Sequence, residues 1–153
     1  MRNRTLILSF FVCGLLAACG SAPYTMTAPQ QFKRFEDDRE FKLITADGVM
    51  LKAREMDNYP QASLEFWTDA AKQHLEKSGY IHETTICFKT TEKKDACTLR
   101  FALPHGAEDW IFQETIFVEG DTLVLVEATG EFQRFKAIEK DLDAALTTFR
   151  PNL

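Results

Sequence analysis

The chain has 153 residues, 45% of them hydrophobic, and its 18 Lys and Arg against 23 Asp and Glu give a formal net charge of −5. This length and composition are typical of one acidic globular domain with a core of its own. An acidic chain without a stripe of Lys and Arg excludes the electrostatic pattern of nucleic-acid binding.

The first 18 residues are predicted to form a signal peptide. Arg2 and Arg4 give it a basic start, residues 5–16 are mainly apolar, and small residues follow. The apolar run is shorter than the ~20 residues that span a bilayer. We therefore expect residues 1–18 to be removed and the chain to be exported.

The tetrad Leu16-Ala17-Ala18-Cys19 resembles the lipobox of bacterial lipoproteins. This resemblance implies a lipidated and N-acylated Cys19 as the first mature residue; the alternative is an incidental cysteine in an ordinary secretory peptide. Each buried methylene contributes about 0.8 kcal/mol, and two or more acyl chains form a durable anchor. Gly20 stands where an aspartate would retain an enteric lipoprotein in the inner membrane. The prediction is therefore an outer-membrane anchor facing the periplasm.

Residues 19–31 are predicted to be the lipidated N-terminus and a flexible tether, because "GSAPYTMTAPQQ" is small, polar and marked by proline. Residues 32–153 are predicted to form a single domain. Asp47-Gly48 between two alternating segments is a strong hairpin signal. Strands are predicted at 40–45, 49–54, 80–89, 96–103, 110–119 and 122–129, helices at 60–78 and 131–149, and an additional strand at 32–36.

The helices are assigned from apolar periodicity. Leu64, Trp67 and Leu75 fall on one face of the first helix, and a similar apolar stripe runs along residues 131–149. The short connections between the last four strands predict an antiparallel meander. The element order ββαββββα predicts an α+β fold, an antiparallel sheet of about six strands packed by two helices.

Cys87 and Cys97 flank a polar turn between two predicted strands. An exported chain enters an oxidising compartment, so we expect a disulfide across this hairpin, contributing roughly 2 to 3 kcal/mol by the chain-entropy model. The alternative is a metal or redox pair, but neither cysteine has a neighbouring His or Cys.

The segments "IFVEGDTLVLVEATG" and "AIEKDLDAALTTFRP", with the closing pair Thr148-Phe149, resemble the PsbP/Mog-type sandwich family that includes the DcrB-like envelope lipoproteins. The resemblance covers roughly residues 33–150. It implies a non-catalytic envelope protein that binds or assists others, and it supplies no catalytic residue.

Chemical motifs are few in the sequence. His74, His82 and His105 do not pair at metal-ligand spacing. His105 with Glu108 and Asp109 could form a small metal or acid site, the alternative being a solvated turn. Nucleophile elbows and phosphate loops are missing from the sequence. We expect no catalytic residue, metal or cofactor, although a pocket with convergent acids of shifted pKa would favour an enzyme.

The sequence contains 13 Phe, 3 Tyr and 2 Trp, more than a minimal core needs. Phe66 lies off the buried stripe of the first helix, and Tyr59 and Trp110 join it as a predicted interaction surface. The predicted function is a lipid-anchored, non-catalytic binding or accessory module of the cell envelope with a protein partner. The alternative is a periplasmic inhibitor or immunity lipoprotein against a delivered toxin.

Overall fold

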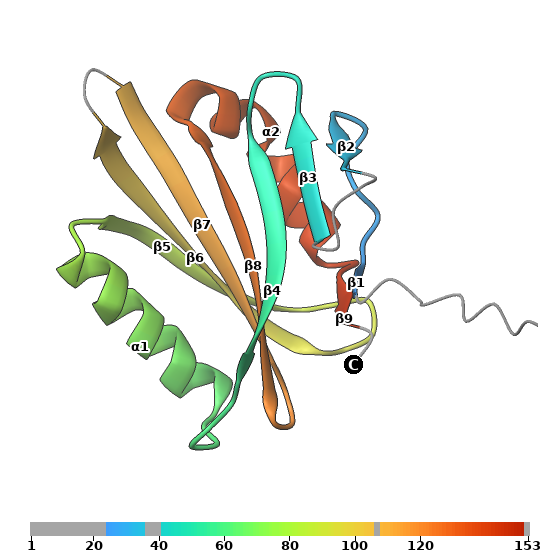
Figure 1. Cartoon of the computed structure of the whole chain (residues 1–153), viewed down its shortest axis with the longest axis vertical. Helices are drawn as coiled ribbons and strands as arrows, with labels where there is room; N and C mark the ends of the chain where they lie inside the picture. Colours follow the sequence, from blue (N-terminus) through green and yellow to red (C-terminus); the bar gives the residue numbers. More distant parts are fainter. Residues whose placement is uncertain (1–23, 36–40, 106–107, 152–153) are drawn as a thin grey trace, which may run out of the picture.

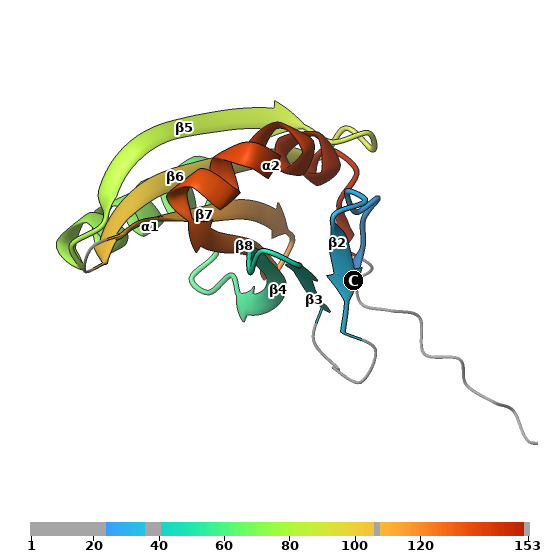
Figure 2. The ribbon, with the colours of Figure 1, turned by 90° about the horizontal axis from the view of Figure 1, so that it is seen from above.

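The computed structural model describes residues 24–35, 41–105 and 108–151, and it confirms the α+β fold. A curved antiparallel sheet of seven strands carries two helices (Figures 1 and 2). The seventh strand, beyond the sheet of about six, is the additional strand predicted at 32–36. The strand order is β2-β3-β4-β8-β7-β6-β5. The elements are β2 (Phe32–Arg34), β3 (Phe41–Thr45), β4 (Met50–Asp57), α1 (Leu64–Lys77), β5 (Ile81–Lys89), β6 (Asp95–His105), β7 (Glu108–Glu119), β8 (Thr122–Glu131) and α2 (Phe132–Leu146).

The strands β5 to β8 form the predicted meander, and the β3–β4 hairpin joins it through β4 and β8. Met50 pairs with Thr129 and Asp57 with Thr122, so this contact runs the length of β4. Gly48 occupies the β3–β4 turn with a φ of +87°, a conformation that side chains with a Cβ rarely adopt. The Asp47-Gly48 signal therefore placed the turn correctly.

Successive side chains along the strands point to opposite faces of the sheet and pack into two separate cores. Ile111 and Phe117 of β7 belong to the larger core beneath α2, whereas Phe112 and Ile116 of the same strand pack in the smaller core beneath α1. The sheet curves around α2 (Figure 2), which buries its predicted apolar stripe. Within the described residues, no helix has both the length and the apolar composition to cross a membrane.

Tyr24, the first residue that the structure describes, is packed although it lies within the segment predicted as a tether. Tyr24 and Thr25 form β1 (Tyr24–Thr25), which pairs with β9 (Arg150–Pro151) near the end of the chain. The Tyr24 ring is buried, stacks on Phe149 at 5.6 Å between centroids, and donates its hydroxyl proton to Glu55 Oε1 at 2.7 Å. An aromatic residue that fills a core position thus ties down the predicted tether, whose residues 19–23 lie outside the described part.

The helix α1 begins at Leu64, later than the predicted residue 60. The Ser63 side chain accepts a hydrogen bond from the Phe66 backbone NH and caps the helix. The helix α2 ends at Leu146, and Phe149 turns into the larger core. Local capping and core packing, rather than apolar periodicity, set both boundaries.

The predicted disulfide between Cys87 and Cys97 is confirmed. The two cysteines lie directly opposite each other in the β5–β6 register. Cys97 is buried and Cys87 is exposed on the edge strand of the sheet. The bridge therefore ties the sheet edge to its neighbouring strand.

Candidate functional site

Asn58 is a buried residue that organises the loop between β4 and α1. Its Oδ1 accepts hydrogen bonds from the Ala62 backbone NH at 3.0 Å and from Trp67 Nε1 at 2.7 Å. Its Nδ2 donates to the Gly120 carbonyl at 2.9 Å, across to the turn between β7 and β8. A satisfied buried network of this kind rigidifies the segments it joins.

This loop and the first turn of α1 present exposed aromatic side chains. Tyr59 is 87% exposed and Phe66 is 56% exposed, and the Tyr59–Pro60 peptide bond is cis. The Phe66 ring meets the Trp67 ring edge-on at 5.4 Å, and it is not packed beneath the loop. We call Tyr59, Pro60 and Phe66 the aromatic tip.

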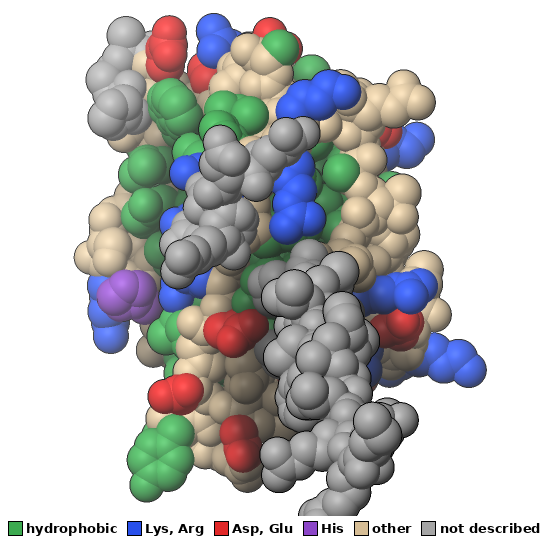
Figure 3. Space-filling model, turned by 45° about the vertical axis from the view of Figure 1, so that its right-hand side comes forward, with side chains coloured by type: hydrophobic (Ala, Val, Ile, Leu, Met, Phe, Trp, Pro, Cys, Tyr) green, Lys and Arg blue, Asp and Glu red, His purple; other side chains and the backbone are tan. Residues whose placement is uncertain are grey.

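Carboxylates flank the aromatic tip. Residues 57–71 contain no Lys or Arg but include Asp57, Glu65 and Asp69, all of them exposed. Figure 3 shows acidic side chains at the lower left of this face, at the end of the molecule where α1 begins, whereas basic ones lie higher, at the left edge beside a histidine, and at the right. The tip is therefore apolar at its centre and negative around it.

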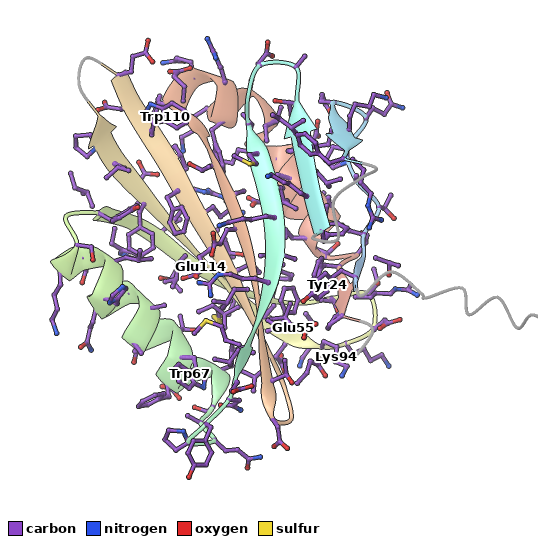
Figure 4. All side chains as sticks on the ribbon, in the orientation of Figure 1. Tyr24, Glu55, Trp67, Lys94, Trp110 and Glu114 are labelled. Carbon is purple, nitrogen blue, oxygen red and sulfur yellow. A yellow bond between two sulfur atoms is a disulfide. The ribbon has the colours of Figure 1, made fainter. Side chains whose placement is uncertain are left out.

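Trp110 lies at the other end of the molecule from Trp67 (Figure 4). It is half-buried near the start of β7 and pairs with Glu131, whereas the aromatic tip follows the end of β4, which pairs with the start of β8. The length of the sheet separates the two places. The structure therefore brings together Tyr59 and Phe66 of the predicted surface, but not Trp110.

A cleft of about 390 Å³ lies between α1 and the strands β4, β7 and β8. It exists because α1 packs on β5, β6 and β7 and leaves the neighbouring β8 and β4 uncovered on this face. We call it the α1 cleft. Its apolar walls include Trp67 and Ala70 of α1, Phe112 and Ile116 of β7, and Leu123 and Leu125 of β8.

Glu114 of β7 reaches the α1 cleft between these apolar residues (Figure 4). It is only 6% exposed and lies directly opposite Glu127 in the β7–β8 register. Among the described residues, its nearest cation is Arg54, with 3.8 Å between Nη2 and Oε1. Burial, together with the negative charge of Glu127, raises the pKa of Glu114 to about 7, although Arg54 opposes the shift.

Glu127 of β8 has the opposite electrostatic environment. Burial would raise its pKa, but hydrogen bonds and attraction from Lys52 and Arg54 outweigh burial and lower it. Lys52 Nζ lies 2.8 Å from Oε2, and Arg54 Nε lies 2.5 Å from Oε1. Both oxygens of Glu127 therefore contact cations, whereas the Glu114 carboxyl faces the cleft.

The sequence analysis missed both glutamates of this cleft. The sequence marks each of them as a glutamate inside a strand-like run, "WIFQETIFV" or "LVLVEA". In each run, the alternation of side chains between the two faces of a strand places the glutamate on a covered face. Their meeting depends on the β7–β8 register, which places them opposite each other. A charged residue interrupting an apolar strand is the observation that could have drawn attention to them.

The histidines were predicted not to pair, and His74 and His82 lie on different elements, α1 and β5. His74 lines the α1 cleft, and the His82 ring packs on Phe101 with 5.4 Å between centroids. The side chain of His105 lies outside the described residues. Over the described part of the chain, no group of three or more His, Cys, Asp or Glu side chains could hold a metal ion.

This chain resembles known proteins in structure but not in sequence. The sequence matches no family model and no curated protein. The structure is similar to PsbP of Synechocystis sp. PCC 6803, with a TM-score of 0.59 and 9% identity over 91% of this chain and 98% of PsbP. The fold is of the PsbP/Mog type.

Two other solved structures share this fold. Protein PA94 of Pseudomonas aeruginosa has a TM-score of 0.63 and 13% identity over 84% of this chain and 98% of its own. The Saccharomyces cerevisiae Ran-binding protein Mog1p has a TM-score of 0.54 and 10% identity over 84% of this chain and 90% of its own. The predicted sandwich is therefore confirmed as a fold, and the likeness to DcrB-like lipoproteins stays a prediction.

Proposed function

We propose that this protein is a lipid-anchored, non-catalytic binding module of the bacterial cell envelope that docks a basic protein partner through the aromatic tip. The observation that carries the proposal is the exposure of Tyr59 on a hydrogen-bonded loop and of Phe66 on the first turn of α1, with exposed acidic residues nearby in the chain. Mog1p, which shares the fold, is a Ran-binding protein. This supports the fold as a scaffold for protein binding.

A rigid aromatic tip is suited to association. Asn58 already holds the loop through bonds to Ala62, Trp67 and Gly120, so little backbone freedom remains to be lost on binding. Aromatic side chains dominate the binding energy of protein interfaces because each buries a large apolar area. Tyr59 and Phe66 are therefore the residues expected to enter the partner.

The carboxylates around the tip select the charge of the partner. Complementary charge accelerates encounter and disfavours partners of like charge. With three acids and no base in residues 57–71, the tip favours a surface rich in Lys and Arg. We expect binding to weaken as salt is added, because salt screens exposed charges beyond about 8 to 10 Å.

The predicted lipid on Cys19 would place this tip at a membrane surface. Anchoring raises the effective concentration of the domain toward other envelope proteins without any new contact. The signal peptide, the lipobox and Gly20 support an outer-membrane anchor facing the periplasm. The accessory role follows from this combination of anchor, compact domain and exposed tip.

The test is cross-linking in intact cells of the wild-type chain, Phe66→Glu and Tyr59→Ala. Both substitutions alter exposed side chains, and both are expected to remove the same adduct because they act on one surface. Ile81→Glu is the matched control, since Ile81 is 57% exposed but lies beyond the other end of α1. Adducts unchanged in both tip variants would exclude the aromatic tip as the docking surface.

Two other functions lead to different outcomes. An inhibitor of a delivered toxin would use the same acidic tip, and its cross-linked partner would be a basic secreted toxin. The second function is catalysis, and the observation in its favour is the raised pKa of Glu114. A binding role fits the α1 cleft better than a catalytic one. Lys52 and Arg54 engage both oxygens of the second carboxylate, Glu127, which is therefore not free to act with Glu114.

A further inference from the structure

The Glu114 carboxyl makes no hydrogen bond with the described residues and faces the α1 cleft; every fully buried polar side-chain atom among the described residues has a partner. Among the described residues, its closest cation is Arg54, whose Nη2 lies 3.8 Å from Glu114 Oε1, which exceeds hydrogen-bond length. Burying a carboxylate without such a bond is costly. A ligand that donates a hydrogen bond here would recover part of this cost.

The residues that line the α1 cleft indicate which kind of ligand body would fit there. Carbon atoms from Trp67, Phe112, Ile116 and Leu125 face the space, so an apolar body is favoured. A volume of about 390 Å³ lies near the lower end of the range for small-molecule sites. The space suits a single ring or a short alkyl chain.

The charges around Glu114 determine the head group. Lys52 and Arg54 of β4 are already engaged by Glu127 of β8, and His74 of α1 is exposed at the cleft. Arg54 lies 3.8 Å from Glu114 and is bound more closely by Glu127, so burial and the charge of Glu127 raise the pKa of Glu114 in spite of Arg54. An ammonium group would supply the missing positive charge, whereas an anionic head would meet two carboxyl groups.

We propose that the α1 cleft binds a small primary amine with an apolar body, whose ammonium group donates hydrogen bonds to the Glu114 carboxylate. This site is separate from the aromatic tip and goes beyond the proposed docking function. Failure of either proposal leaves the other standing. The bound amine would lie between α1 and the sheet, with its apolar body against Phe112 and Leu125.

The test uses three probes with similar bodies and different heads: phenethylamine, the neutral 2-phenylethanol and the anionic phenylacetate. Binding to the full-length protein in detergent is followed by calorimetry. A charge-assisted hydrogen bond is stronger than a neutral one, so we expect phenethylamine to bind about tenfold more tightly than phenylethanol. Phenylacetate is expected to bind most weakly.

Two variants and a pH comparison distinguish this proposal from non-specific binding of apolar compounds. Glu114→Gln should weaken the amine about tenfold and change phenylethanol binding by less than about twofold. Ala70→Phe should fill the cleft and weaken the binding of all three probes.

Amine binding should strengthen between about pH 5 and about pH 8 as Glu114 ionises. Tighter binding of phenylacetate, unchanged amine binding in Glu114→Gln, or absence of binding at millimolar amine would each overturn the proposal.

Discussion

At the scale of single residues, Glu114 couples folding to pH. Its pKa rises from an ordinary 4.5 to about 7 in the folded chain, so the folded state holds this proton more tightly than the unfolded state. The free energy of unfolding therefore falls as pH rises between these two values and stays lowered above them. At about pH 8 this cost is about 3 kcal/mol.

Glu114→Gln should remove this dependence because glutamine carries no charge. We expect the variant to unfold with nearly the wild-type free energy at about pH 5, and to be more stable by up to about 3 kcal/mol at about pH 8. Urea unfolding at both pH values measures the difference. Glu108→Gln is the control, since Glu108 lies exposed on the same strand. A stability difference independent of pH would contradict this account of Glu114.

At the scale of elements, one buried arginine fastens α2 to the sheet. Arg100 of β6 is 4% exposed. Its Nη1 donates to Glu139 Oε1 at 2.6 Å and its Nη2 to Asp143 Oδ1 at 2.9 Å, both on α2. Its Nε and Nη2 also donate to the fully buried Gln113 Oε1, at 2.9 and 2.6 Å. A buried cation satisfied in this way fixes how the helix lies on the sheet.

Replacing this arginine should loosen α2. Arg100→Met keeps the length of the side chain but leaves Gln113 and two carboxylates without their donor, and we expect a loss of about 2 kcal/mol. Arg134→Met is the matched control on α2, where the arginine is exposed and should cost less than about 0.5 kcal/mol. Chemical unfolding gives both values, and an equal effect of the two substitutions would count against a specific clamp.

At the scale of the whole molecule, the buried Tyr24 lies only a few residues from the predicted anchor. Only residues 20–23 separate Cys19 from the buried Tyr24, so at most about 17 Å of extended chain joins them. In Figure 1, β1 lies at the right of the sheet, whereas α1 begins at the lower left. The aromatic tip is therefore well separated from the point where the chain would leave for the membrane.

Lipidation at Cys19 is a prediction of its own. Cys19→Ala removes the thiol to which the lipid would attach, and a domain with one acidic face and no acyl chain has little to hold it on a membrane. We expect the variant to move from the detergent phase to the soluble periplasmic fraction on detergent phase separation. Retention of the variant in the detergent phase would mean that a different feature anchors the protein.

Local signals in the sequence were sufficient for most of the elements. Asp47-Gly48 predicted the hairpin because glycine readily adopts the positive φ that this turn needs. Apolar periodicity predicted α2 because a helix repeats every 3.6 residues, which places Phe135, Ile138 and Leu142 on one buried face. Cys87 and Cys97 could be paired because a short polar turn brings neighbouring strands together.

The candidate sites depended on contacts between distant segments. The pairing of β4 with β8 and the packing of Tyr24 on Phe149 have no local signature, since they depend on which surfaces remain to be buried. By itself, the sequence determined the α+β class, the element order, the disulfide and the exposure of Phe66. Only the tertiary structure decided that Asn58 fixes the aromatic tip and that Glu114 faces Glu127 beneath α1, because strand register and helix placement are collective results of packing.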